Sequence, residues 1–177
     1  MRLHLKSTKV DLLAMYDIPT GMKPGPGPWD QEDDKYEWIN EATGYPCIIV
    51  RNQMHAFCGY VGIPKNHALA GKSYSEIEDA GIDVHGGVTY SGEGGVRISI
   101  DPSFGFDPDS IYWVGFDCLH AFDLVPSMQA MMKRHLPAFK PEDKLYKDVY
   151  RTAEYTMEQT DSLAVQLYAQ SVQPEEA

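Results

Sequence analysis

Basic residues are scarce in this sequence, and their scarcity limits the partners that the protein can bind. It contains 15 Lys and Arg against 26 Asp and Glu in 177 residues, for a formal net charge of −11. The basic residues are scattered and form no cluster along the chain. Because nucleic-acid phosphates repel a negative surface, we expect no nucleic-acid partner. A small anionic ligand held by backbone amides and one or two cations stays compatible with this composition.

Cysteines and long apolar runs are also few. The three cysteines, Cys47, Cys58 and Cys118, have no paired spacing, which predicts reduced thiols in a reducing compartment. No apolar run reaches the length of a signal-peptide core or a membrane span. The sequence therefore predicts a soluble cytoplasmic protein with no membrane partner. It leaves a homo-oligomer open.

The order of local patterns predicts one α+β domain over residues 1–177. Residues 20–40 alternate proline and glycine and then turn acidic, which favours an extended surface segment anchored by Trp29 and Trp38. The runs 47–52 and 56–64 predict a hairpin with N-Q-M-H between them. Three further segments have the composition of strands: 83–91, 94–101 and 110–117. We expect a mostly antiparallel sheet of five or six strands.

Two helices are predicted beside this sheet. In the segment 72–81, Ser73 and Glu76 have the spacing of a capping box, and Gly81 would end a short helix. A long C-terminal helix is predicted at about 141–170, because apolar or small side chains recur every three or four residues. This stripe, which we expect to pack on the sheet, is made of Leu145, Val149, Ala153, Met157, Thr160, Ala164 and Leu167.

The first polar motif is D-V-H-G-G, residues 83–87. In an extended strand, residues two apart point to the same face, so Asp83 and His85 would share one space. Gly86 and Gly87 would let a ligand approach the backbone closely. The alternative is a glycine-rich turn with a surface histidine.

The second motif, D-C-L-H-A-F-D, places Asp117, His120 and Asp123 at intervals of three after an aromatic strand. On a helical turn these side chains spread over roughly 120° of one face, so they could converge on one site. The alternative is structural: Asp117 would cap the turn by accepting from the amide of Leu119 or His120. Cys118 is more simply a buried structural thiol than a nucleophile.

Together the two motifs contain both oxygen and imidazole ligands of the kind that zinc or manganese accepts. We therefore predict a divalent metal held by Asp83, His85, Asp117 and His120. Asp123 would orient His120 from behind, and Tyr90 would donate a hydrogen bond to a substrate oxygen. The spacing matches no diagnostic zinc motif, and the sequence has no G-x-S-x-G elbow, P-loop or C-x-x-C.

The ordered set of segments resembles an uncharacterised protein family of tailed phages and prophages. The similarity rests on G-Y-V-G-I-P-K-N-H-A-L-A-G-K-S-Y, D-V-H-G-G-V-T-Y and G-F-D-C-L-H-A-F-D, and extends from about Trp29 to Leu167. It implies a phage origin and a setting in the host cytoplasm. Phe122 stands where a small residue is commoner in that family. As motif positions the resemblance singles out Asp83, His85, Gly86, Gly87, Asp117, His120 and Asp123.

Three functions follow as hypotheses. The leading one is a metal-dependent hydrolase, with Asp83, His85, Tyr90 and Asp123 as catalytic residues. Its substrate would be small, and nucleotide-like or phosphorylated. The alternative is a non-catalytic protein that sequesters a small host nucleotide used in defence signalling. Its ligand would be bound by Gly86, Gly87, Tyr90, Arg97 and Trp113. The third is an accessory protein that binds a host protein through its acidic surface and Pro/Gly segment.

Overall fold

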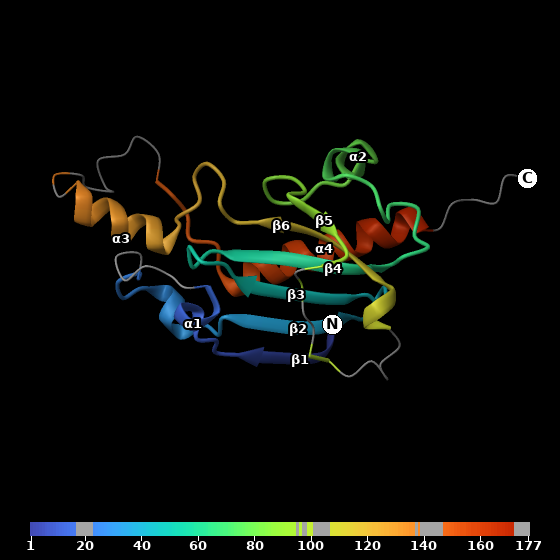
Figure 1. Ribbon diagram of the computed structural model, residues 1–177, viewed down its shortest axis with the longest axis horizontal. Coiled ribbons are helices and arrows are strands. Elements are labelled where there is room, and N and C mark those ends of the chain that lie inside the picture. Colours follow the sequence, from blue (N-terminus) through green and yellow to red (C-terminus); the bar gives the residue numbers. More distant parts are fainter. Residues whose placement is uncertain are drawn as a thin grey trace, which may run out of the picture.

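The computed structural model describes residues 1–16, 23–94, 96, 99–100, 107–136, 138 and 147–171. Within them lies a six-stranded antiparallel sheet in the order β1-β2-β3-β4-β6-β5, with the long helix α4 along one face (Figure 1). This arrangement confirms the predicted α+β fold. The strands are β1 (Arg2–Thr8), β2 (Lys35–Asn40), β3 (Pro46–Arg51), β4 (Phe57–Pro64), β5 (Tyr90–Gly92) and β6 (Ile111–Asp117). The α-helices are α1 (Leu12–Tyr16), α2 (Tyr74–Asp79), α3 (Pro126–His135) and α4 (Ala153–Ser171).

The predicted β3–β4 hairpin is confirmed, and its turn is built by Asn52. The Asn52 amide donates to the Ala56 carbonyl (2.8 Å), and the Asn52 side-chain oxygen accepts from the Met54 amide (2.9 Å). His55 adopts a left-handed backbone conformation, with φ of 62°. The short helix α2 is confirmed as well, with the Ser73–Glu76 capping box in place.

The two faces of the sheet bury different side chains, as the alternation along each strand requires. On one face, Val61, Val114 and Phe116 pack in the main core beneath α4. On the other face, Ile48, Ile111 and Trp113 form a smaller cluster with Tyr60 and Tyr90 around them. A position on a strand thus determines whether its side chain can reach α4.

Helix α4 begins at Ala153, twelve residues after the start predicted from the sequence. Val149 is 50% exposed and lies in a β-bridge with Asp123, so it is not part of the buried stripe. The hydroxyl of Thr152 accepts from the amide of Tyr155 (3.2 Å), which caps the helix at this point. Leu145 lies outside the described residues. The rest of the stripe is buried as predicted: Ala153, Met157, Thr160, Ala164 and Leu167.

Asp161 joins α4 to the first strands of the chain. Its carboxylate accepts from Arg2 Nε (2.8 Å), Trp38 Nε1 (2.8 Å) and Asn40 Nδ2 (2.9 Å). Arg2 lies on β1, and the other two donors lie on β2. One helical carboxylate therefore fixes two strands that are more than one hundred residues away in the sequence.

The described part of the 20–40 segment is only partly extended, which corrects its prediction. It contains a 3-10 turn at Pro28–Gln31 and enters β2 at Lys35. Trp29 and Trp38 are both buried, as predicted. None of the helices that the structure describes is both long enough and apolar enough to span a bilayer.

Candidate functional site

The D-V-H-G-G motif forms a turn and not the predicted strand. Gly86 and Gly87 have φ of 68° and 88°, and the Gly87 amide donates to the Val84 carbonyl (2.9 Å). Two successive left-handed residues end an extended conformation, so Asp83 and His85 do not share a strand face. Strand β5 begins only at Tyr90. The segment 94–101 was also predicted as a strand. Its described residues Val96, Ser99 and Ile100 are not in a strand.

Helix α4 positions this turn through two glutamines. Gln166 accepts from the Asp83 amide and donates to the Asp83 carbonyl, both at 2.8 Å. Gln159 accepts from the His85 amide at 3.1 Å. The Asp83 residue is exposed, and its backbone, not its carboxylate, makes these contacts. Asp83 is therefore not brought to the group around His85.

His85 lies at the centre of a hydrogen-bonded chain that we call the His85 relay: Tyr155, His85, Asp123 and Arg151. Nδ1 of His85 is 3.0 Å from the Tyr155 hydroxyl, and Nε2 is 2.8 Å from Asp123 Oδ2. Arg151 Nε donates to the other Asp123 oxygen at 2.7 Å. Both ring nitrogens of His85 are thus occupied by side chains from different elements.

Charge and burial set the protonation of Asp123, Arg151 and Tyr155 in the His85 relay. Burial alone would raise the pKa of the Asp123 carboxyl, but hydrogen bonds from Arg151 and His85 outweigh it and lower the pKa. The Arg151 pKa is raised by its hydrogen bond to Asp123. Burial raises the pKa of the Tyr155 phenol. At neutral pH the relay therefore contains a protonated phenol at one end and, on the other side of His85, an ionised carboxylate paired with Arg151.

Asp117 ends strand β6, and the residues after it form bends and turns up to the β-bridge at Asp123, not the predicted helical face. Asp117 Oδ1 accepts from the Leu119 amide (3.0 Å), which matches the capping alternative. Asp123 does not orient the His120 ring as predicted, because it accepts from the His120 backbone amide (3.0 Å) and from the His85 ring. Nε2 of His120 lies 3.5 Å from Asp117 Oδ1.

The two histidine rings meet edge to face, with centroids 5.6 Å apart. Gly86 makes this contact possible, because a Cβ at that position would overlap Cδ2 and Nε2 of His120. Gly87 is fitted in the same way against Glu78, whose carboxylate accepts from the Val88 amide (2.9 Å). The second motif thus lies against the first, as a shared site requires.

Two of the residues expected to hold a sequestered ligand, Trp113 and Tyr90, are not assembled around His85. Trp113 and Tyr90 belong to the cluster on the face of the sheet opposite α4, and the Tyr90 hydroxyl donates to the Gly94 carbonyl. Trp113 is buried, so it offers no open stacking surface. Arg97 lies outside the described residues. The structure brings together His85, Gly86, Asp117, His120 and Asp123, and leaves Asp83, Tyr90 and Trp113 apart from them.

Two members of the relay, Tyr155 and Arg151, were not predicted from the sequence. Arg151 lies two residues before α4 and bonds to Asp123, and Tyr155 lies in the first turn of α4 and bonds to His85. The described residues contain no group of three or more His, Cys, Asp or Glu side chains placed to hold a metal ion. No family model, curated protein or solved structure matches this chain.

Proposed function

We propose that this protein is a hydrolase of a small phosphorylated or nucleotide-like substrate, in which Tyr155 is the nucleophile and His85 its base. The observation that carries the proposal is the unbroken hydrogen-bonded chain from the Tyr155 hydroxyl through His85 to Asp123 and Arg151. The same order of nucleophile, imidazole and carboxylate is how hydrolases activate a hydroxyl. The substrate class follows from the sequence resemblance and not from these contacts.

The proton transfers of this mechanism follow from the partners of each atom. A carboxylate only accepts hydrogen bonds, so Nε2 of His85 carries a proton toward Asp123. In the neutral imidazole Nδ1 then accepts the Tyr155 proton, and the phenolate oxygen attacks the electrophilic phosphorus. The imidazolium returns this proton to the leaving oxygen, giving a covalent phosphotyrosyl intermediate. A water molecule then gives one proton to Nδ1 while its oxygen attacks the phosphorus, which breaks the phosphorus–oxygen bond to Tyr155 and releases the phosphorylated product. The imidazolium gives that proton to the Tyr155 phenolate, which restores the hydroxyl.

The imidazole of His85 and the guanidinium of Arg151 favour this reaction at Tyr155. Burial raises the pKa of the phenol, so the hydroxyl is protonated at rest and needs a base within hydrogen-bonding distance. The Arg151 guanidinium lies over the Tyr155 ring, 4.9 Å from its centroid, where its positive charge favours the phenolate. Asp123 accepts the hydrogen bond from His85 Nε2 (2.8 Å), which holds the imidazole ring in its orientation toward Tyr155.

A divalent metal would bind at Asp117 and His120 in a metal-dependent form of this mechanism. Nε2 of His120 is a buried nitrogen without a hydrogen-bond partner among the described residues. It lies 3.5 Å from Asp117 Oδ1, close to the separation of two ligand atoms on one zinc or manganese ion. Bound there, the metal would supply a Lewis acid for the substrate oxygen. The metal hypothesis thus keeps two of its four predicted ligands.

The test is turnover of p-nitrophenyl phosphate, bis-p-nitrophenyl phosphate and p-nitrophenyl acetate by wild type, Tyr155→Phe and His85→Ala. We expect each variant to lose roughly a hundredfold or more of kcat, the scale of a lost nucleophile or base. Mass spectrometry of the wild type quenched during turnover should find the adduct on the peptide that contains Tyr155. Tyr74→Phe, an exposed tyrosine on α2, is the matched control and should keep full activity.

Melting temperature and metal content complete the experiment. If Tyr155→Phe melts lower but keeps its turnover, the relay only fastens the 82–89 turn to α4, and the proposal is wrong. Absence of turnover of all three esters by the wild type contradicts it equally. Metal analysis of protein purified without chelator should show occupancy that His120→Ala abolishes and Tyr155→Phe retains, if the hydrolase uses a metal.

A further inference from the structure

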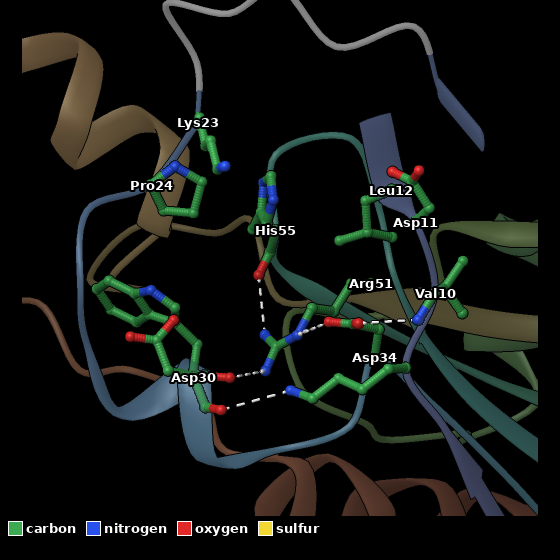
Figure 2. Close-up of a pocket in the computed structure, with 11 residues that line it drawn as sticks. Val10, Asp11, Leu12, Lys23, Pro24, Asp30, Asp34, Arg51 and His55 are labelled. Carbon is green, nitrogen blue, oxygen red and sulfur yellow. Dashed lines mark hydrogen bonds and ion pairs between the residues drawn. The ribbon is translucent and has the colours of Figure 1, made fainter. Parts of the chain in front are cut away.

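A cavity of about 320 Å³ lies where the chain leaves β1 and β3, and none of its lining residues belongs to the His85 relay (Figure 2). Its walls are the residues that follow β1, the Pro/Gly segment and the turn of the β3–β4 hairpin. Val10, Leu12 and Pro24 give it an apolar side, and Lys23 and His55 give it a polar side. The volume is at the lower end of the range for small-molecule sites.

The floor of the cavity is a fixed ion pair and is not free to bind a ligand. Arg51 is 1% exposed, and its Nε donates to Asp34 (3.1 Å) while Nη2 donates to Glu32 (2.8 Å). Its Nη1 donates to the His55 carbonyl (3.0 Å) and to the Tyr150 hydroxyl (2.8 Å). Arg51 therefore shapes the cavity, and its charge is neutralised by the two carboxylates.

Lys23 is the cation that this arrangement leaves for a ligand. Its side chain points toward His55 across the mouth of the cavity (Figure 2), and it makes no hydrogen bond or ion pair with another described residue. Lys9, by contrast, donates to the carbonyls of Asp30 and Glu32. Asp11 lies on the opposite wall from Lys23, so an anion would bind at the Lys23 side.

His55 lies at a left-handed position of the hairpin turn, and its ring contacts α3. Its φ of 62° is a conformation that glycine and asparagine adopt more often than other residues. Its Nδ1 lies 2.7 Å from the hydroxyl of Ser127, which is fully buried at the start of α3. This contact fixes the ring and leaves Nε2 as the nitrogen for a ligand.

The Ser127 contact also decides what Nε2 can do. Burial lowers the pKa of His55, and the Arg51 guanidinium lowers it further, so the imidazole is neutral. When the Ser127 hydroxyl donates to Nδ1, the single ring proton is on Nε2. Nε2–H is then a donor beside the Lys23 ammonium, and both groups suit the same anionic oxygens.

We propose that this cavity binds a small organic anion, a phosphate monoester or a carboxylate, with Lys23 and His55 Nε2 on the anionic group and Val10, Leu12 and Pro24 around its carbon body. The site shares no residue with the His85 relay. It therefore stands independently of the proposed hydrolysis, as a binding or regulatory site.

The experiment is titration calorimetry of the full chain with phenyl phosphate, benzoate and benzyl alcohol. We expect one of the two anions to bind and the neutral alcohol not to bind. Lys23→Gln and His55→Asn should each weaken that binding at least tenfold, since Asn keeps the left-handed backbone and removes the ring. Lys133→Gln, which removes an exposed lysine of α3 outside the cavity, should bind like wild type.

The two anions distinguish the chemical class. Tighter binding of phenyl phosphate assigns the site to phosphate monoesters, and tighter binding of benzoate assigns it to carboxylates. Tyr155→Phe should bind as wild type does, which separates this site from the relay. Equal affinity of wild type, Lys23→Gln and His55→Asn for both anions, or no binding by the wild type, would overturn the proposal.

Discussion

Gly86 determines how the two histidines of the polar motifs lie against each other. Its φ of 68° is left-handed, and its missing side chain leaves room for the edge of the His120 ring. Gly44 has a similar φ of 72° but open space where a Cβ would be. The two glycines therefore share the backbone requirement and differ only in the contact.

We predict that Gly86→Ala destabilises the protein by about 2–3 kcal/mol, because an alanine there adds an overlap to the cost of the left-handed backbone. Gly44→Ala should cost only about 1 kcal/mol, for the backbone alone. Denaturant unfolding of both variants measures the difference. Equal losses would show that the turn moves freely away from His120.

The sequence predicted part of the site because its motifs are local. Asp117, His120 and Asp123 are close in the chain, and the two glycines after His85 indicate an irregular backbone. Tyr155 and Arg151 could not be predicted in the same way. Their role depends on α4 packing beside residue 85, at separations of 70 residues for Tyr155 and 28 residues between Arg151 and Asp123. Only the tertiary fold brings such side chains together.

Helix α4 provides one side of the main core. Leu167 is fully buried, and its carbonyl accepts from His67 Nε2 at 2.9 Å. Val165, two residues earlier on the same helix, is 50% exposed. The helix therefore offers a buried and an exposed apolar position with nearly the same sequence environment.

We predict that Leu167→Asp lowers the free energy of unfolding by about 4 kcal/mol or more, because the new carboxylate would be buried without a partner. Val165→Asp should change it by less than about 1 kcal/mol, since its side chain reaches solvent. Thermal and urea unfolding of the two variants provide the comparison. A stable Leu167→Asp protein would mean that α4 does not pack on the sheet as described.

Elements with a strong local signal were predicted well. The hairpin, the Ser73 capping box and the aromatic strand β6 each follow from residues within one short segment. Strand β1 was missed because most of its side chains are exposed, so its sequence lacks a buried face. The predicted start of α4 was too early. The amide of Ala153, the first residue of the helix, donates to Glu32 (2.7 Å), and this residue is 121 positions away in the sequence, so no local pattern indicates it.

The three thiols report on the folding of the whole molecule. Burial raises the pKa of Cys58 to about 11 and that of Cys118 to about 12, and it raises the pKa of Cys47 well above its usual value. The thiolate is the reactive form, so each thiol is unreactive at pH 8 while the fold is intact.

We predict that iodoacetamide at pH 8 labels none of the three cysteines in the folded protein and all three in urea. Mass spectrometry of the intact chain should therefore show only the unmodified and the triply modified species across the transition. Labelling of one cysteine before the others would instead show that part of the sheet opens separately from the rest.

The attachment of Asp161 to Arg2, Trp38 and Asn40 has a consequence for vectorial synthesis. The ribosome makes β1 and β2 first, and their partner on α4 emerges more than one hundred residues later. Until then, the apolar face formed by β2, β3 and β4 has no helix over it, and such a nascent chain is prone to aggregate. The packing of this face is therefore completed only after α4 has been synthesised.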